Sequence, residues 1–227
     1  MIAQHIDSIR QRIAKSALQA GRRPEDIRLV AVSKTVAAER IRQAFHAGLR
    51  VFGENYIQEA RDKAQALSDL PIEWHFIGHL QSNKAKYAVR QFSLIHSVDS
   101  LRLAAEIDRE ARKAGKIQPI LIQVNVAGEA TKSGIDPEAL IDLVRSVSAL
   151  SHVRVAGLMT MPPFSEDPEA SRPHFRRLKA LADHCAASVP GIDLRELSMG
   201  MSGDFEVAVS EGATLVRIGT AIFGERS

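Results

Sequence analysis

The sequence predicts one α/β domain, spanning residues 1–227, that folds as a (β/α)8 barrel. Eight short apolar, β-branched runs recur along the chain, and each is typical of a strand buried on both faces. Helix-like patterns lie between these runs, so that strand and helix alternate eight times. Eight such units in a chain long enough for one sizeable core favour closure into a barrel. An open doubly wound sheet is the alternative that the same alternation allows.

The strands are expected where β-branched and apolar residues cluster between turn signals. Their predicted ranges are 29–33, 50–53, 73–78, 94–98, 119–125, 153–160, 196–200 and 215–219. The carboxyl ends of barrel strands meet at one face, which carries the active site in such barrels. In this sequence the residues that close the runs are unusually polar or rich in glycine. We therefore expect the chemistry of the protein at these ends.

Helical patterns fill the intervals between the strands. Asp136 as a cap and Pro137 in the first turn precede apolar residues spaced i, i+3, i+4 and i+7, and an earlier helical pattern stops at Gly48. Residues 1–20 space four isoleucines by three or four positions. This stripe predicts an additional N-terminal helix outside the repeat, and not a signal peptide.

Composition argues against several classes of protein. Thirty basic and 27 acidic residues give a formal net charge of +3, with the two signs interspersed, which does not favour nucleic acid as a partner. No segment approaches the roughly 18 to 20 apolar residues of a membrane span, so we expect a cytosolic protein. The eight histidines show no metal-ligand spacing, so no metal site is expected. The single cysteine, Cys185, lies on the apolar face of a helical pattern, where it should pack as a small apolar residue.

The first strand, LVAVSK, leads into Lys34 at the mouth of the predicted barrel. Partial removal from water at that position disfavours the ammonium and favours the free amine, which can attack an aldehyde. Lys34 is therefore a candidate Schiff-base lysine. The alternatives are that it reaches solvent or pairs with Glu54 at the end of the second strand.

Two later mouths carry the residues of an anion site. The seventh strand leads into Ser198, Met201, Ser202 and two glycines before a helix that begins near Phe205. The eighth strand leads into Gly219 and Thr220. Loops after the seventh and eighth strands are the usual phosphate pocket of such barrels, because backbone N–H groups and hydroxyls converge there. A phosphate monoester is the ligand that we expect, although each glycine alone is also typical of a turn.

Further polar residues are expected to line a cavity of the size of one ring. Arg217 follows Leu215 with a period of two in an apolar strand, so its buried guanidinium needs a carboxylate or a ligand atom as partner. Asn55 and Asn125 close two other strands, and His79 beyond Gly78 should face the same cavity. His75, inside a strand, is interpreted as a core histidine with its hydrogen bonds satisfied.

Six segments together resemble one family. They are AVSKT at 31–35, FGENYIQEA at 52–60, WHFIGHLQSNK at 74–84, GLMTM at 157–161, LSMGMSGD at 197–204 and VRIGTAIFG at 216–224. In this order, each at a predicted barrel mouth, they are similar to the pyridoxal 5′-phosphate (PLP) homeostasis proteins, also called the YggS/PROSC family. The likeness covers nearly the whole chain; one departure is Ala127-Gly128 at the mouth of the fifth strand, near Asn125 and Lys132.

This resemblance implies a fold and a set of roles. The fold would be the alanine-racemase-like barrel without its C-terminal β domain, and Lys34 would hold PLP as a Schiff base. Ser202, with the backbone near Met201, Gly219 and Thr220, would hold the phosphate. Arg217 would meet the pyridine nitrogen, and Asn55 and Met159 would flank the ring. A positively charged arginine keeps that nitrogen unprotonated, which makes the ring a weak electron sink.

The function expected from these features is intracellular PLP homeostasis with little or no turnover. The alternative is a PLP-dependent amino-acid racemase or lyase, but the two tyrosines, Tyr56 and Tyr87, follow early strands and do not supply the late acid/base tyrosine of the racemases. A Schiff-base aldolase acting on a sugar phosphate would also need a barrel lysine, and it lacks an evident general base here. PLP-dependent apo-enzymes are the expected recipients, and without a second domain we expect a monomer.

Overall fold

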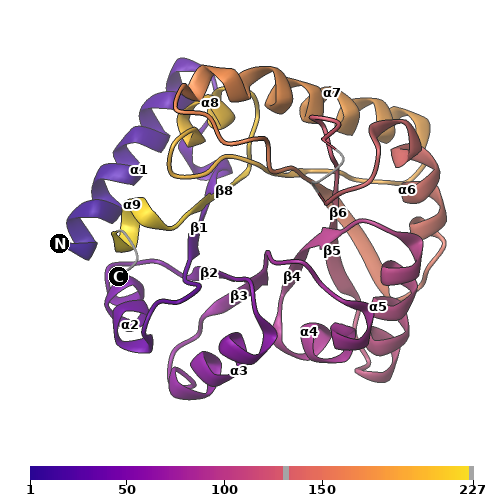
Figure 1. Ribbon diagram of the computed structural model, residues 1–227, viewed down its shortest axis with the longest axis horizontal. Coiled ribbons are helices and arrows are strands. Elements are labelled where there is room, and N and C mark those ends of the chain that lie inside the picture. Colours follow the sequence, from indigo (N-terminus) through magenta and orange to yellow (C-terminus); the bar gives the residue numbers. More distant parts are fainter. Residues whose placement is uncertain (130–132, 225–227) are drawn as a thin grey trace.

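The computed structural model describes residues 1–129 and 133–224. Within these residues, eight parallel strands follow one another around a closed barrel, and β1 pairs with both β2 and β8 (Figure 1). The strands are β1 (Arg28–Val32), β2 (Val51–Glu54), β3 (Glu73–Phe76), β4 (Leu94–Val98), β5 (Gln118–Gln123), β6 (Val153–Met159), β7 (Glu196–Ser198) and β8 (Leu215–Ile218). At the seam Arg28 lies beside Leu215 and Val30 beside Arg217. This closure confirms the predicted barrel and excludes the open sheet.

Every predicted strand forms, within two residues of its predicted range at either end. Most of the difference lies at the carboxyl ends, where β3, β5 and β7 each stop two residues early. There the chain turns out of the ladder toward the loops at the mouth: Gly200, two residues after β7, has a φ of +90°. An added Cβ at Gly200 would lie 2.5 Å from the Cβ of Ala208, so only glycine fits this turn.

The helices lie outside the ring of strands (Figure 1). They are α1 (Ile2–Gln19), α2 (Ala38–His46), α3 (Ile57–Ala66), α4 (Ala85–Gln91), α5 (Leu101–Lys113), α6 (Leu140–Ser148), α7 (Arg172–Ser188), α8 (Phe205–Ser210) and α9 (Thr220–Phe223), with single 3-10 turns at Pro24–Asp26, Ser82–Lys84, Pro137–Ala139 and Pro168–Ser171. Asp136 caps the turn before α6 as predicted, because its carboxylate accepts a hydrogen bond from the N–H of Glu138. Gly48 follows α2 with a φ of +94°.

The additional helix α1 covers the outside of the barrel where the C-terminal helices are short. Its buried residues include Ile6, Ile9 and Ile13 of the predicted stripe, and the first isoleucine of that stripe, Ile2, is partly buried against the same core. Figure 1 shows α1 beside α8 and α9, and the ring of His5 contacts the carbonyl oxygen of Ile222 at 3.0 Å. Because α8 has six residues and α9 four, α1 supplies the apolar cover that a longer last helix would otherwise give.

The strands are covered by apolar side chains on both faces. The small inner cluster consists of Val30, Val51, Leu94, Leu121, Ala156, Met159 and Leu215. The larger outer cluster lies between strands and helices, and it includes Cys185 of α7, which is fully buried as expected for a small apolar residue. Among the described helices, none combines the length and apolar character needed to cross a bilayer.

Candidate functional site

A cavity of about 320 Å³ opens at the carboxyl ends of the strands. Its lining residues are Val32, Lys34, Asn55, Ile77, Gly78, His79, Gln123, Ser133, Met159, Met161, Met201 and Arg217. Five of the nine residues predicted to bind the cofactor are among them, and they come from the ends of β1, β2, β6 and β8 and from the loop after β7. The cavity therefore lies at the face where barrel chemistry is expected.

Lys34 follows β1 and is half-buried at the wall of this cavity. The next residue, Thr35, has a φ of +62°, which is a strained conformation for a β-branched residue. Its backbone N–H donates to Oε1 of Glu59 at 2.5 Å. The turn that carries Lys34 is therefore held from outside the barrel by α3.

A buried ion-pair network supports the same turn on its outer side. Nζ of Lys63, on α3, lies 2.8 Å from Oε1 of Glu54 and 2.6 Å from Oε1 of Glu59, and it donates to the carbonyl oxygen of Ser33 at 2.5 Å. The Ser33 hydroxyl also donates to Glu54 at 2.7 Å. Burial raises the pKa of Glu54, and the hydrogen bonds from Lys63 and Ser33 oppose that rise. The Glu54 carboxylate, considered above as a partner for Lys34, is thus bonded to Lys63 and Ser33 and does not line the cavity.

Asn55 is positioned by a close approach of two loops. An added Cβ at Gly78 would lie 2.2 Å from the carbonyl oxygen of Asn55, so the loop after β3 can pass here only with glycine. His79, which follows Gly78, is exposed and lines the cavity as predicted. His75 is fully buried and hydrogen-bonded, which confirms its interpretation as a core histidine.

Arg217 lies under the cavity and is 5% exposed. Its Nη1 donates to the hydroxyl of Ser198 at 2.5 Å, and its Nη2 donates to the carbonyl oxygen of Thr160 at 2.9 Å. Burial lowers the pKa of Arg217 to about 10, while the nearby charge of Asp204 opposes that fall. Within the described residues Arg217 has no carboxylate at ion-pair distance, so its charge is met by neutral oxygens alone.

Ser198 occupies a different place from the other predicted cofactor-binding residues. It is fully buried, lies behind Arg217, and is not among the residues that line the cavity. Its hydroxyl contacts the guanidinium and Nδ1 of His96, the latter at 2.9 Å. The turn at Gly200 begins after Ser198, so Met201 is the first residue beyond β7 that reaches the mouth.

The loops after β7 and β8 meet where phosphate binding was predicted. The N–H of Ala221, in the first turn of α9, contacts Oγ of Ser202 at 3.4 Å and so joins the two loops. Asp204 accepts from the N–H of Met201 in its own loop at 2.7 Å, and from the hydroxyl of Ser171, at the end of the turn before α7, at 2.8 Å. Gly219 precedes α9, and Thr220 is its exposed first residue. Of the predicted phosphate-binding residues in these two loops, Met201 lines the cavity, whereas Ser202, Gly219 and Thr220 are not among its lining residues.

Some lining residues were not singled out from the sequence. Gln123, Ile77, Ser133 and Met161 line the cavity; Gln123 also donates to the carbonyl oxygen of Ser133 at 3.1 Å. Asn125, expected in the lining, instead donates to the carbonyl oxygen of Glu129 within its own loop. The period-two pattern of β5 could have indicated Gln123, since Leu121 faces inward. Lys132 lies outside the described residues.

Relatives in sequence agree over the whole length of the chain. Residues 4–227 match the family described as the N-terminal domain of alanine racemase. A pyridoxal phosphate homeostasis protein of Aquifex aeolicus is 49% identical over 223 residues, which cover 98% of this chain and 97% of the relative. A protein of the same name from Pseudomonas aeruginosa is 47% identical over 227 residues, covering 99% and 96%.

Solved structures give the same result. The structure of PipY from Synechococcus elongatus with PLP bound has a TM-score of 0.88 and 40% identity, and the match covers 99% of this chain and 100% of PipY. An alanine racemase of Clostridium difficile has a TM-score of 0.75 at 15% identity, covering 95% of this chain and 55% of the racemase, which shows a common fold alone. By sequence over its length and by the closed barrel with its cavity at the strand ends, the chain belongs to the pyridoxal phosphate homeostasis protein family.

Proposed function

We propose that this protein binds PLP in the cavity at the barrel mouth, as a Schiff base on Lys34, and that it serves intracellular PLP homeostasis with little or no turnover. The relatives named for this role, and PipY solved with PLP, support the choice of ligand. The observation that carries the proposal in this chain is Arg217. It is a buried cation at the cavity whose only partners within residues 1–129 and 133–224 are the neutral oxygens of Ser198 and Thr160.

The donors around the cavity fit the chemistry of PLP. A guanidinium has five N–H groups, so the contacts with Ser198 and Thr160 do not use all the donors of Arg217, and this side chain lines the cavity. A pyridine nitrogen is an acceptor that would satisfy one of them. The hydroxyl of Ser202 and the backbone near Met201, Gly219 and Thr220 would hold the phosphate at the mouth. Asn55 and Met159 would lie against the ring.

Lys34 would supply the covalent link. Its amine would condense with the aldehyde of PLP, so that a C=N bond would replace the C=O bond and the oxygen would leave as water, with no oxidant or reductant needed. The bond is reversible by the addition of water. A cofactor held in this way can be stored and released, which is what a homeostasis function requires.

The residues expected around the ring support low turnover. When bound, PLP supplies an electron sink for amino-acid chemistry, and that sink is strongest when its ring nitrogen is protonated. A permanently charged donor at the nitrogen keeps it unprotonated. In addition, neither tyrosine of the chain lines the cavity: Tyr56 is 61% exposed and Tyr87 is 37% exposed. The two-base arrangement of a racemase therefore lacks its tyrosine here.

The test is to mix the protein with PLP, follow the yellow absorbance, reduce with borohydride, and locate the added mass by peptide mapping. We expect one adduct, on Lys34, that is absent from Lys34→Ala. Lys84→Ala is a matched control, because Lys84 lies in the turn that follows β3 but does not line the cavity. An adduct scattered over surface lysines, or none, would contradict the proposal and favour the aldolase, which binding of sugar phosphates would then reveal.

A second candidate function is a slow racemase or lyase, favoured by the one imidazole at the cavity. His79 is exposed at the rim and lines it, so it could exchange a proton with a bound amino acid. Loss of deuterium from the α-carbon of a labelled amino acid, above the level of Lys34→Ala and reduced in His79→Ala, would support this activity. Exchange equal to that of Lys34→Ala excludes it.

Delivery of PLP to apo-enzymes, a cytosolic location and a monomeric state remain parts of the proposal. Delivery is tested by the rate at which PLP-loaded protein reactivates an apo-enzyme. A rate equal to that of free PLP at the same total concentration would contradict delivery, since dissociation into solution alone would explain it. Light scattering of the apo and loaded protein decides the oligomeric state.

A further inference from the structure

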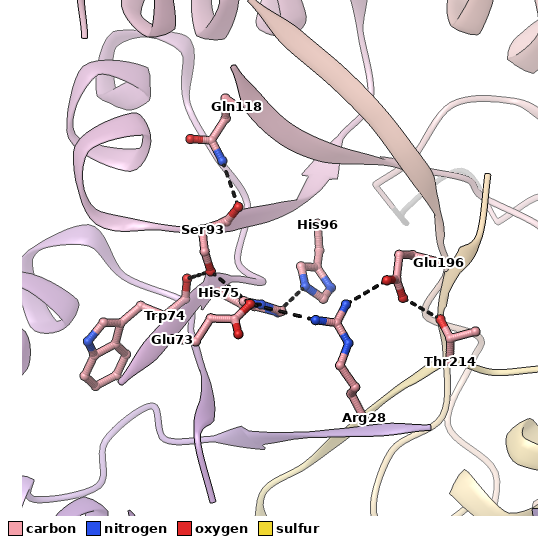
Figure 2. Close-up of polar contacts among 9 residues, drawn as sticks. All are labelled: Arg28, Glu73, Trp74, His75, Ser93, His96, Gln118, Glu196 and Thr214. Carbon is pink, nitrogen blue, oxygen red and sulfur yellow. Dashed lines mark hydrogen bonds and ion pairs between the residues drawn. The ribbon is translucent and has the colours of Figure 1, made fainter. Parts of the chain in front are cut away.

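A continuous chain of polar side chains runs through the barrel interior from Glu73 at its amino-terminal end to Arg217 under the cavity. Nε2 of His75 lies 2.9 Å from Oε1 of Glu73, and Nδ1 of His75 lies 3.0 Å from Nε2 of His96. Nδ1 of His96 lies 2.9 Å from Oγ of Ser198, which accepts from Arg217. Figure 2 shows the part of this hydrogen-bonded series at the amino-terminal end of the barrel, in which the His75 ring lies between Glu73 and the His96 ring. The site described above uses Arg217 but neither His75 nor His96.

The chain has one self-consistent direction when both histidines are neutral. A guanidinium only donates, so the Ser198 oxygen accepts from Arg217 and its own hydrogen goes to Nδ1 of His96. His96 must then carry its hydrogen on Nε2 and donate it to Nδ1 of His75. His75 in turn carries its hydrogen on Nε2, which donates to the Glu73 carboxylate. Every contact has one donor and one acceptor, from a cation at the mouth to an anion at the opposite end.

The opposite direction requires an additional proton. If His96 donated to Ser198, its Nε2 would accept from His75, and the contact with Glu73 would need a second hydrogen on His75 or a protonated Glu73, whose pKa is lowered by the hydrogen bond with His75. His75 and His96 are both fully buried. Burial lowers the pKa of His75, and burial together with the charges of His75 and Arg217 holds the pKa of His96 well below its usual range. The neutral arrangement is therefore the one that the surroundings favour.

The burial of Ser198, His75 and His96 also prevents water from replacing any one of these three side chains. Ser198, His75 and His96 have no exposed surface, and Arg217 has 5%. The inward faces around them carry the inner apolar cluster. If His96 could not accept, the hydroxyl hydrogen of Ser198 would need another acceptor, and the orientation of the hydroxyl that receives Arg217 would change.

We propose that His96, supported by His75 and Glu73, is a positioning residue for the cofactor-facing guanidinium: by taking the hydroxyl hydrogen of Ser198, it fixes the Ser198 oxygen as the acceptor for Arg217. The orientation of the guanidinium under the ring is then set from inside the barrel. This inference rests on the proposed function for its effect on PLP. The hydrogen arrangement itself does not depend on PLP.

The first arm of the test measures the hydrogens directly, by ¹⁵N NMR of the histidine side chains in the whole protein without PLP at pH 7. We expect His75 and His96, assigned with His75→Asn and His96→Asn, to be neutral with hydrogen on Nε2. A doubly protonated His75, or hydrogen on Nδ1 of His96, would overturn the inference. This arm stands whether or not PLP binds.

The second arm compares two variants of equal size. In His96→Asn the carboxamide oxygen can occupy the place of Nδ1 and accept from Ser198, whereas His96→Leu removes the acceptor. Because the Ser198 oxygen would no longer be fixed as the acceptor for Arg217, we expect His96→Leu to raise the Kd for PLP about 5-fold or more, and His96→Asn to raise it by less than about 3-fold. Ser97→Ala is the matched control, because the buried Ser97 hydroxyl on the same strand has no hydrogen-bond partner in the described chain.

A double-variant cycle separates positioning from a general effect on packing. If His96 acts through Arg217, the His96→Leu substitution should weaken PLP binding when Arg217 is present. The same substitution should cause no further loss of PLP binding in a protein that already carries Arg217→Met. Equal fold-losses in both backgrounds would overturn the inference. Should His96→Leu fail to fold by circular dichroism, Ser198→Ala, which removes the acceptor of Arg217, takes its place in the same cycle.

Failure of the inference and failure of the proposed function give different results. If the wild-type protein gives no Lys34 adduct with PLP, the proposed function fails and the NMR arm still decides the hydrogen arrangement. If the adduct forms and His96→Leu binds PLP as tightly as His96→Asn, the proposed function stands and the positioning role is overturned.

Discussion

Nζ of Lys63 lies 2.5 Å from the carbonyl oxygen of Ser33, the residue that precedes Lys34. One residue after Lys34, the N–H of Thr35 is bonded to Glu59, which also contacts Lys63. The backbone on both sides of the proposed Schiff-base lysine is therefore held by two residues of α3, the buried Lys63 and the partly exposed Glu59. These contacts balance the strain at Thr35, whose positive φ costs on the order of 1–3 kcal/mol.

Lys63→Met should destabilise the protein and slow the formation of the Lys34 adduct. The change leaves Glu54, which is fully buried, without its cation, and breaking a buried pair costs about 3–5 kcal/mol. Urea unfolding measures the loss. Lys113→Met is the control, because the Lys113–Glu110 pair has a 60% exposed lysine and its removal should cost less than about 1 kcal/mol. Equal losses in the two variants would contradict a special role for Lys63.

Gly78→Ala should lower stability by about 1–3 kcal/mol or more, because the new methyl group would overlap the backbone at Asn55. Displacement of Asn55 should also weaken PLP binding. Gly203→Ala, where no atom lies within 4 Å of the added Cβ and φ is not positive, should stay within about 0.5 kcal/mol of the wild type. Thermal unfolding and PLP titration of both variants check these expectations; a tolerated Gly78→Ala would show that the loop can move.

Arg217→Met should leave the protein without PLP about as stable as the wild type, or more stable, while weakening PLP binding. The buried guanidinium has no carboxylate partner within the described residues, and its lowered pKa reports the cost of burying the charge. Unfolding in urea at pH 7, without and with PLP, measures both quantities. If Arg217→Met lowered the free energy of unfolding by more than about 2 kcal/mol without PLP, the contacts with Ser198 and Thr160 would fully offset the cost of burying the guanidinium charge.

Ser202→Ala should weaken the binding of PLP more than that of pyridoxal, which lacks the phosphate. The wild type should favour PLP over pyridoxal, and the variant should reduce this preference about 3-fold or more, as expected for the loss of a hydrogen bond to a charged group. Titrations of both ligands with both proteins give the ratio. A preference unchanged by the substitution would place the phosphate elsewhere in the cavity.

Stability should fall as the pH decreases below about 6.5, the ordinary pKa of histidine. Because burial lowers the pKa of His75 and His96, the unfolded chain binds protons in this range that the folded chain excludes, and the contribution is lost as the pH falls. Each histidine contributes at most about 1.4 kcal/mol per pH unit. Urea unfolding between pH 8 and 5.5 should show a shallower fall in His96→Asn. Parallel curves for the two proteins would contradict the assignment.

The barrel was predictable because each strand carries its own signal. The runs at 29–33 and 94–98 are apolar and β-branched, and the helical intervals have their own period, so class and order follow from local sequence. The placing of Lys34, Asn55, Met159, Met201 and Arg217 around one cavity then follows from the rule that parallel strands end at one face.

Contacts across the barrel were not predictable in the same way. His96 was hidden inside an apolar strand, although its period-two spacing from Leu94 resembles that of Arg217 from Leu215. Its partners lie on β3 and β7, and the height at which these strands face one another depends on the stagger of the closed sheet. In the sequence Lys63 was likewise indistinguishable from the other charged residues of its helix, because its burial depends on how α3 packs over β1 and β2.

The docking of α1 against α8 and α9 affects how the chain is made. The His5–Ile222 contact joins residues 217 positions apart, so the first helix leaves the ribosome long before the surface that covers it exists. During synthesis its isoleucine stripe is exposed, and so is the open edge of β1, which awaits β8. Pairing of β1 with β8 and docking of α1 on α9 join segments that are far apart in the sequence, and such contacts raise the contact order of the fold and slow its formation.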